Sequence, residues 1–292
     1  MDIFAYLKER LPFAACERNF SFAAHTTIGC GGTAAAAISP KSCEETAQVL
    51  ALLERERIPY CLLGSGANVL PAEGFFEGAV VRFVGLKTLF LGDGLFAGAG
   101  VTGGELLAFA RANRIGGFEP FTGIPTSVGG GVAMNAGVKE RHFGDLVSSV
   151  LAVERGKIRT IPAENCLFSE KNSLFLQKIA VVGVYFKAIS SSEETIDAET
   201  QRYRLRRAHL PKGRSMGCTF VNPEGISAGK LVEECGLKGR TKGKARVSEI
   251  HANFIINEGG SANDVSALIS EVKSEVSRQT GIALREEIRR IP

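Results

Sequence analysis

Two glycine-rich segments are the parts of this 292-residue chain whose residue types and spacing most clearly indicate chemistry. The longer one, Gly123–Gly137, sets its glycines among apolar residues that favour burial, whereas a flexible linker would be polar throughout. Gly129, Gly130 and Gly131 carry no Cβ atoms, so their successive amides could form a concave site for a phosphate or another electron-rich group. A tight buried turn is the alternative, because glycine clusters also arise from packing.

The second segment, Gly64–Leu70, directly follows the apolar run Pro59–Leu63, which is typical of a buried strand. A strand followed by a turn of small residues is the usual construction of a phosphate-binding loop. This segment has neither the lysine of a P-loop nor the Gly-x-Gly-x-x-Gly spacing of a Rossmann site. Gly98–Gly103 does have that spacing, but no acidic residue ends a second strand about 20 positions later, so we interpret it as a strand-to-helix turn.

Three titratable side chains in the last third of the chain are candidates for proton transfer. Cys218 lies between a glycine and an expected strand, directly after a basic stretch. A thiol near cations titrates in a useful range, although a buried cysteine is more commonly a small apolar filler. Glu286 and Glu287 are adjacent, so in a strand their side chains would point to opposite faces. One of them could face a cleft, and the sequence alone does not say which.

The basic stretch before Cys218 has two interpretations. It contains Arg202, Arg204, Arg206, Arg207, His209, Lys212 and Arg214. Such runs are commonly solvated helix faces, and the alternative is an anion site for a phosphorylated substrate or NADPH. The net charge of +4 is too small to indicate nucleic-acid binding by itself. With four histidines and no Cys-x-x-Cys pair, the chain offers little material for a metal site.

The composition is that of a globular protein. Hydrophobic residues make up 45% of the chain and charged residues 23%. The longest apolar stretches fall far short of the roughly 20 residues that cross a bilayer, and the N-terminus has no secretory pattern. Seven scattered cysteines argue against a disulfide framework. We therefore expect a cytoplasmic protein with reduced thiols that binds neither nucleic acid nor a membrane. A monomer with a small-molecule partner is a further expectation, although the composition does not determine the oligomeric state.

The elements that must position these residues alternate between helix and strand. We expect helices over residues 43–57, 105–113, 199–208, 227–235 and 264–280. We expect strands over residues 59–63, 79–83, 95–99, 147–154, 157–161, 179–188, 254–256 and 284–291. The polar segment Ser190–Glu194 has no apolar face and is expected to be a loop or a domain boundary. This pattern indicates a mixed α and β class with several small sheets.

Taken together, the motifs resemble those of the UDP-N-acetylenolpyruvoylglucosamine reductase (MurB) family, of the shorter type. The resemblance extends from about His25 to Ile291, with the motifs in order and at family-like spacing. The segments that carry it are Gly64–Leu70, Gly123–Gly137, Asn222–Gly225, Ala228–Gly239, Ser248–Asn257 and Leu284–Ile288.

The resemblance implies an α+β fold with FAD as a tightly bound cofactor and NADPH as the reductant. It implies a two-part FAD-binding region of the vanillyl-alcohol-oxidase/PCMH type and a smaller α+β substrate domain. The first part would be residues 1–84, with 281–292 returning to it, the second 85–205, and the substrate domain 206–280. The implied reaction reduces an enolpyruvyl ether to a lactyl ether, giving UDP-N-acetylmuramate for peptidoglycan synthesis.

The resemblance also implies roles for individual residues. The family's proton donor falls on Cys218, and the glutamate that stabilises the enol-like intermediate falls on Glu287. Contacts with the UDP-sugar fall on Lys212, Asn222 and Lys230. Contacts with FAD fall on Leu63, Gly64, Ser65, Gly66, Ala67, Asn68, Val69, Gly123, Ile124, Pro125, Ser127, Val128, Gly129, Gly130, Asn135, Ala136 and Gly137.

Two segments depart from the family pattern. Glu170 and Lys171 stand where the family has Tyr-Arg, and that arginine polarises the substrate carboxylate. Lysine keeps the charge but loses the two-pronged guanidinium contact. Gly137–Gly144 replaces the family's Gly-Ala-Tyr-Gly. The alternatives are therefore another FAD oxidoreductase on the same flavin domain, or a flavin- or UDP-sugar-binding homologue impaired by the change at Lys171.

Overall fold

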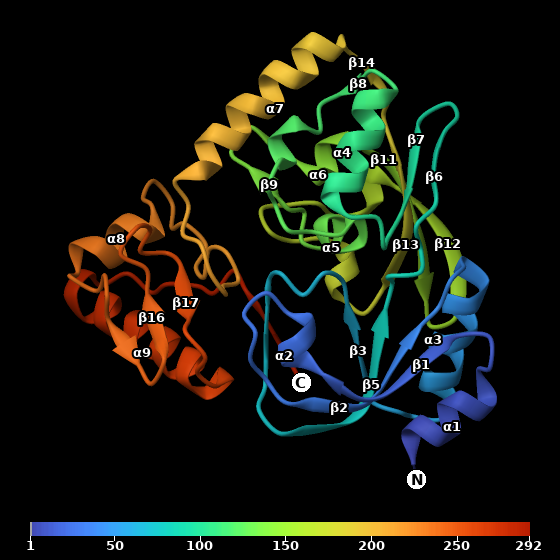
Figure 1. Ribbon diagram of the computed structural model, residues 1–292, viewed down its shortest axis with the longest axis horizontal. Coiled ribbons are helices and arrows are strands. Elements are labelled where there is room, and N and C mark those ends of the chain that lie inside the picture. The colour runs from blue at the N-terminus through green and yellow to red at the C-terminus, as the bar shows by residue number, and fades with distance from the viewer. Residues whose placement is uncertain (1) are drawn as a thin grey trace. The chain divides into compact units, whose positions relative to one another are not determined.

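The computed structural model describes residues 2–292, which divide into two compact units. The first unit holds the chain up to Arg18, together with Ala35–Ser65 and Glu77–Ala208. The second unit holds Asn19–Ala34, Gly66–Phe76 and His209–Pro292. Helices and strands alternate in the chain, as the sequence indicates (Figure 1). The three-part division into two flavin-binding parts and a substrate domain remains a prediction.

The first glycine segment begins at the end of a strand in a four-stranded sheet. The sheet has the order β1-β2-β5-β3, and β3 and β5 run parallel. The helix α3 leads into β3, and Ser42 caps α3 by accepting a hydrogen bond from Glu45 N at 3.1 Å. The elements of this region are α1 (Ile3–Arg10), β1 (Ala15–Ser21), β2 (Thr33–Ser39), α3 (Cys43–Arg55), β3 (Tyr60–Leu63) and β5 (Phe75–Arg82).

The second glycine segment lies beside a five-stranded antiparallel sheet with the order β12-β11-β13-β7-β6. The helix α5 packs on β13. Stacked rings of Phe121 and Phe143, with centroids 4.2 Å apart, fill the core next to α5. The elements are β6 (Leu89–Leu91), β7 (Leu95–Gly98), α4 (Gly103–Ala112), η1 (Glu119–Phe121), α5 (Val128–Ala133), α6 (Phe143–Leu146), β11 (Val147–Glu154), β12 (Lys157–Pro162) and β13 (Ala180–Phe186).

Shorter elements complete the first unit. The hairpin β9–β10 follows the second glycine segment directly, and β8 pairs with β14. Both pairs are antiparallel and two residues long. They are β8 (Ile115–Gly116), β9 (Gly137–Val138), β10 (Arg141–His142) and β14 (Ile189–Ser190), with the 3-10 turns η2 (Ala163–Asn165) and η3 (Leu174–Leu176).

The prediction of a loop over residues 190–194 is wrong in part, because the last helix of the first unit starts there. The helix α7 spans Glu193–Ala208, six residues longer than expected at its start. The hydroxyl of Ser192 accepts a hydrogen bond from Thr195 N at 3.2 Å, which is how a helix start is capped. Only Ile196 and Tyr203 of α7 are buried. The helix therefore lacks the apolar stripe by which a sequence reveals its first turn.

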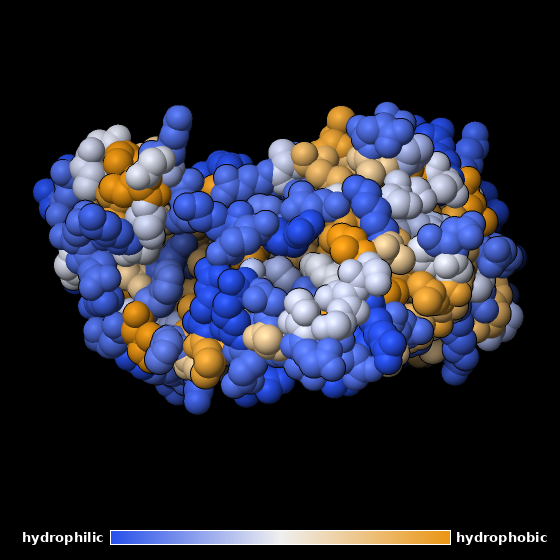
Figure 2. Space-filling view, turned by 90° about the horizontal axis from the view of Figure 1, so that it is seen from above, coloured by the Kyte–Doolittle hydropathy of each residue, from blue (hydrophilic) through white to orange (hydrophobic). Residues whose placement is uncertain are grey.

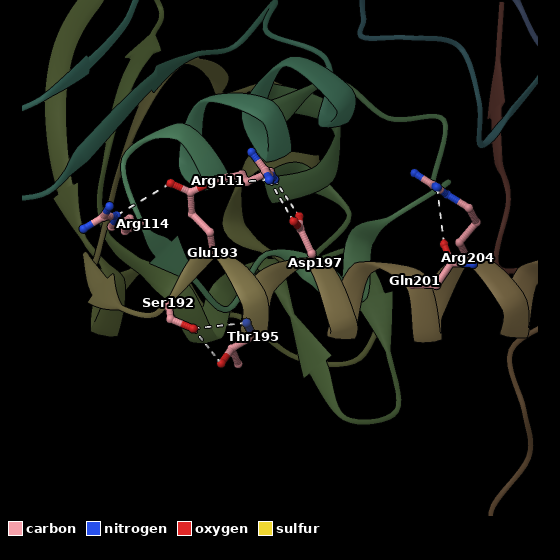
Figure 3. A network of polar contacts seen from close by, with 8 residues as sticks. All are labelled: Arg111, Arg114, Ser192, Glu193, Thr195, Asp197, Gln201 and Arg204. Atoms are coloured by element: carbon pink, nitrogen blue, oxygen red, sulfur yellow. Dashed lines mark hydrogen bonds and ion pairs between the residues drawn. The ribbon is translucent and has the colours of Figure 1, made fainter.

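Charged side chains tie this first turn to α4 instead (Figure 3). Arg111 donates two hydrogen bonds to the carboxylate of Asp197, at 2.5 and 2.7 Å. Glu193 forms ion pairs with Arg111 and Arg114. These side chains are about half exposed, so each pair contributes little to stability by itself. Together, these ion pairs nevertheless hold the first residues of α7 in place.

The second unit is built around the long helix α9, which covers a three-stranded sheet of order β15-β16-β17. Ser261 and Asp264 form a capping box at its start, and Gly281, at φ 75°, ends it. The helix ends where the sequence predicts and starts two residues earlier than predicted. The elements are α2 (Phe22–His25), β4 (Val69–Pro71), α8 (Ala228–Glu234), β15 (Thr241–Lys242), β16 (Ala245–Val247), β17 (Ile255–Asn257), α9 (Ala262–Thr280) and β18 (Arg289–Ile291).

The prediction of a strand over residues 284–291 is correct only for its end. β18 spans Arg289–Ile291 and pairs in parallel with β4. The preceding residues pair elsewhere: Phe220 and Glu286 form an isolated bridge. The chain thus changes partner within the segment, which a pattern of alternating apolar residues does not reveal.

The face drawn in Figure 2 is mostly hydrophilic, with hydrophobic residues in small patches. Among residues 2–292, no helix is long and apolar enough to cross a bilayer.

Candidate active site

The structure brings the two glycine segments of the first unit together. A Cβ atom added to Gly64 would lie 2.9 Å from Ser127 Oγ and 3.4 Å from Gly130 Cα. The Ser65 hydroxyl donates a hydrogen bond to Pro125 O at 3.0 Å. Backbone can approach so closely only because glycine has no side chain. Residues 63–65 and 123–130, which the sequence indicated separately, therefore lie next to each other in the first unit.

The three consecutive glycines do not form the expected row of available amides. They lie in α5, where Gly129 N donates to Ala99 O at 2.9 Å and Gly131 N donates to Ser127 O at 2.8 Å. Gly130 N is 3.4 Å from the capping hydroxyl of Ser127. The interpretation of these amides as a concave anion site is therefore wrong. The sequence does not indicate this helix, because glycine normally disfavours helix.

Close packing explains why glycine is needed at two of these positions, but it does not explain the third. A Cβ at Gly129 would lie 2.8 Å from Ala99 Cβ, and one at Gly131 would lie 2.9–3.2 Å from three atoms of the Phe143 ring. A Cβ at Gly130 would meet only hydroxyl oxygens, at 3.3 and 3.8 Å, and Gly64 Cα at 4.0 Å. Gly130 is the one that faces the other glycine segment.

Asn135 organises the far end of the same segment. Its buried side chain donates to Ser169 O at 2.9 Å and accepts from Gly144 N at 2.8 Å. Two hydrogen bonds between Ser169 and Asn172 close a tight turn, in which Lys171 has a φ of 55°. The segments that depart from the family pattern are thus joined through Asn135. A Cβ at Gly137 would collide with the backbone of Arg141, so glycine is needed where the hairpin β9–β10 begins.

In the second unit, Thr219 connects the two candidate catalytic residues. Thr219 N donates to Asn253 O, and Glu287 N donates to Thr219 O, both at 2.8 Å. Cys218 also forms a bridge with Phe254. The residue directly after Cys218 is therefore hydrogen-bonded through its backbone to Glu287. Both side chains are half-buried.

Glu286, the first of the two adjacent glutamates, is tied to other parts of the second unit by its side chain. Glu286 accepts hydrogen bonds from Lys273 of α9 at 3.1 Å and from Arg290 at 2.9 Å. Burial alone would raise the pKa of Glu286, but the hydrogen bonds from Arg290 and Lys273 hold it below its usual value. Glu286 is thus an ionised anchor on α9. Glu287 is the next residue, so in an extended chain its side chain would point to the opposite face, and its catalytic role remains a prediction.

Asn68 extends this connection to the first glycine segment. Its side-chain amide donates to Glu287 O at 3.2 Å, and its own carbonyl accepts from Arg289 N at 2.9 Å. A Cβ at Gly66, where φ is 69°, would collide with His25 O. The residues 66–69, predicted to bind the cofactor, are therefore also structural neighbours of Glu287.

The residues predicted to bind the UDP-sugar lie on or before α8. Asn222 Oδ1 accepts a hydrogen bond from Ala228 N at 3.0 Å, so it helps cap α8. Lys230 of α8 is exposed, with its ammonium 3.5 Å from Glu234. Lys212 is exposed on the loop that leads to Cys218.

The basic stretch proves to be a solvated helix face in its first half. Arg202 pairs with Glu199 at 2.5 Å and Arg206 with Glu140 at 2.8 Å. Both guanidinium groups also lie over the ring of Tyr203.

Comparisons with known proteins agree with this geometry. A model described as "FAD binding domain" matches residues 34–158, and one described as "UDP-N-acetylenolpyruvoylglucosamine reductase, C-terminal domain" matches residues 209–291. The reductase of that name from Geobacter metallireducens is 35% identical over 277 residues, covering 93% of this chain and 92% of the relative. The one from Syntrophobacter fumaroxidans is 39% identical over 280 residues, covering 91% and 80%.

A solved structure, that of the reductase from Thermus caldophilus, superposes with a TM-score of 0.84 at 31% identity, covering 96% of this chain and all of the other. The chain belongs to the UDP-N-acetylenolpyruvoylglucosamine reductase family. It is accordingly an FAD-dependent oxidoreductase, which confirms the predicted family, fold class and flavin cofactor.

The residues of the first unit fit an FAD in this member of the reductase family. Where Gly64 meets Gly130, neither residue has a side chain that would obstruct a large flat ligand. The hydroxyl of Thr122, directly before Gly123, is buried and has no hydrogen-bond partner among the described residues. A buried polar atom of this kind is a natural contact for a ligand. The individual flavin contacts remain predictions.

The sequence analysis missed Asn253, which the neighbouring His251 helps to orient. Asn253 is 3% exposed and binds the segment that carries Cys218. His251 Nδ1 accepts a hydrogen bond from Asn253 N at 3.3 Å, and burial lowers the pKa of its imidazole. The one available signal was an asparagine inside the apolar run 252–256.

Proposed function

We propose that the chain reduces UDP-N-acetylenolpyruvoylglucosamine to UDP-N-acetylmuramate for peptidoglycan synthesis, with NADPH as the reductant. Family membership supports this reaction class. The observation that carries the proposal is the backbone hydrogen bond between Thr219 and Glu287. Because Thr219 directly follows Cys218, this bond connects a proton source to a carboxylate through a single residue.

The reaction adds a hydride to one carbon of the enolpyruvyl double bond and a proton to the other. FAD, when bound, supplies the means of relaying the hydride from NADPH. The proton comes from Cys218: the S–H bond breaks as the C–H bond forms, and the thiolate is reprotonated from water. Glu287 stabilises the enol-like intermediate.

Lys171 takes the place of the family's arginine in this proposal. Its ammonium stabilises charge that develops on the substrate carboxylate as the hydride arrives. Support for the assignment comes from the Ser169–Asn172 turn, because Asn135 ties that turn to the end of the second glycine segment. A single ammonium makes one strong contact where a guanidinium would make two.

Lys212, Asn222 and Lys230 are proposed to contact the UDP-sugar, whose diphosphate favours cationic and amide donors. The proposal assigns the reaction to the cytoplasm, where nucleotide sugars and NADPH are available. It also includes a monomeric enzyme and a chain divided at about residues 84 and 205.

Anaerobic absorbance spectroscopy of the purified protein tests the function. The protein should be yellow, NADPH should bleach it, and the enolpyruvyl sugar should restore the colour. UDP-N-acetylglucosamine, which lacks the enolpyruvyl group, is the control and should leave it bleached. A bleached protein that the enolpyruvyl sugar does not recolour would contradict the proposal and favour an impaired homologue.

A further inference from the structure

Asn253 is attached to the segment after Cys218 by three hydrogen bonds. Its Oδ1 accepts from Phe220 N at 2.8 Å, and its Nδ2 donates to Phe220 O at 2.9 Å. Its carbonyl accepts from Thr219 N at 2.8 Å. The Asn253 side chain therefore pairs with both backbone polar groups of Phe220, the N–H and the C=O. Only an amide offers a donor and an acceptor in this arrangement.

The segment before Cys218 is held by other groups. The Thr27 hydroxyl donates to Ser215 O at 2.6 Å, and Asn257 N donates to Arg214 O at 2.9 Å. Gly217, at a φ of 76°, lies between these contacts and Cys218, which itself forms a bridge with Phe254. The two residues directly after Cys218 are the ones that Asn253 holds. On the other side of the same segment, Glu287 N donates to Thr219 O.

Asn253 is in turn held by a tight turn. Its N–H donates to His251 Nδ1 at 3.3 Å, and His251 N lies 3.3 Å from Ser248 Oγ. The His251 ring packs edge-on against Phe254, and Gly229 leaves it room: a Cβ there would lie 3.1 Å from the ring. An imidazole nitrogen that accepts a hydrogen bond is unprotonated.

We propose that Asn253 is a positioning residue, which fixes the Cys218 thiol relative to Glu287 so that the proton is delivered to the substrate carbon. His251 supports it by orienting the backbone of Asn253. The inference rests on the proposed function, in which Cys218 is the proton donor. It adds a residue that touches neither substrate nor cofactor and acts through the backbone of residues 219 and 220.

Asn253→Asp is the test variant, because it keeps the shape and the acceptor but loses the donor to Phe220 O. Asn257→Asp is the matched control. Asn257 is also 3% exposed and lies in the same turn-and-strand segment, but it binds Ile28 O and Gly260 N. Both substitutions remove one buried hydrogen bond, so both should lower the melting temperature similarly.

Three measurements separate positioning from stability. Asn253→Asp should slow recolouring by the enolpyruvyl sugar about 10- to 100-fold, since small displacements of a catalytic group have large effects on rate. The solvent isotope effect on the recolouring rate of Asn253→Asp should rise, because proton transfer becomes rate-limiting. NADPH should bleach both variants at the wild-type rate. Iodoacetamide should alkylate Cys218 several-fold faster in Asn253→Asp alone, as read by peptide mass mapping.

Equal alkylation and recolouring rates in the two variants would overturn the inference. If Asn253→Asp does not fold, His251→Ala takes its place: slower recolouring with faster alkylation of Cys218 supports the inference, and wild-type values overturn it. A wild-type protein that the substrate does not recolour would instead refute the proposed function. The alkylation comparison would still test Asn253 on its own.

Discussion

Alanine substitutions at two adjacent glycines of α5 should have opposite effects. At Gly131, the new Cβ would lie 2.9–3.2 Å from three atoms of the Phe143 ring. That ring is fully buried and stacked on Phe121 at 4.2 Å, so it cannot move away. Overpacking of this kind costs about 1–3 kcal/mol, against a gain of about 1 kcal/mol from replacing glycine in a helix. Gly131→Ala should therefore be neutral to destabilising by about 2 kcal/mol.

At Gly130, the new Cβ would be 3.3 Å from a hydroxyl oxygen and 4.0 Å from Gly64 Cα. With little overpacking, the helix gain dominates, and the apoprotein should be stabilised by up to about 1 kcal/mol. The same methyl group would occupy the space between the glycine segments and weaken FAD binding.

The assay combines thermal unfolding of the apoprotein with the FAD content of the purified protein. About 1 kcal/mol corresponds to roughly 2–4 °C in melting temperature for a chain of this size. Gly130→Ala should unfold at the same or a higher temperature yet retain less FAD, and Gly131→Ala should unfold at an equal or lower temperature. Full FAD occupancy in Gly130→Ala would refute a contact between this glycine and the flavin. A stabilised Gly131→Ala apoprotein would refute the packing argument.

Substitutions at three further residues test the proposed chemistry and its framework. Cys218→Ala should bleach normally with NADPH but recolour on the order of 10²–10⁴ times more slowly with substrate, whereas Cys218→Ser should retain appreciable activity; wild-type turnover of the alanine variant would make the thiol a packing residue. Lys171→Met should lose roughly 3–4 kcal/mol of transition-state stabilisation, seen as recolouring about two orders of magnitude slower, and Lys171→Arg should recover activity unless Glu170 captures the guanidinium. Thr219→Val should keep both half-reactions and unfold at the same or a higher temperature, because the buried Thr219 hydroxyl has no hydrogen-bond partner among residues 2–292. A clear loss of recolouring in Thr219→Val would mean that the hydroxyl has a function of its own.

The sequence predicts most elements whose stability is local. The long helix α9 is predicted to within two residues at its start and correctly at its end, where Gly281 follows it. The predicted ranges also match four of the five strands of the five-stranded sheet, all except β6. It failed where the stabilising contacts are distant in sequence. The first turn of α7 depends on Arg111, more than 80 residues away, and residues 284–288 pair with a segment near Phe220.

The candidate site, like the fold, was predictable only in part. Residue types and family resemblance point to Cys218, Glu287 and the two glycine segments. They do not distinguish Gly130 from its neighbours, because the difference lies in Ala99 and Phe143. Residue types alone do not choose between Glu286 and Glu287. The family resemblance points to Glu287, and the structure shows that Glu286 binds Lys273 of α9. Positioning residues such as Asn253 are the least predictable, because their partners are backbone atoms, which every residue possesses.

The link through Thr219 implies that the contributions of Cys218 and Glu287 are not independent. Glu287 N is bonded to Thr219 O, and Asn68 holds the Glu287 carbonyl, so a shift at either end displaces the other. Residues that act as a unit show non-additive effects on rate. The double variant Cys218→Ala, Glu287→Gln should therefore be little slower than the worse single variant. Effects that multiply would instead indicate two groups that act separately on the substrate.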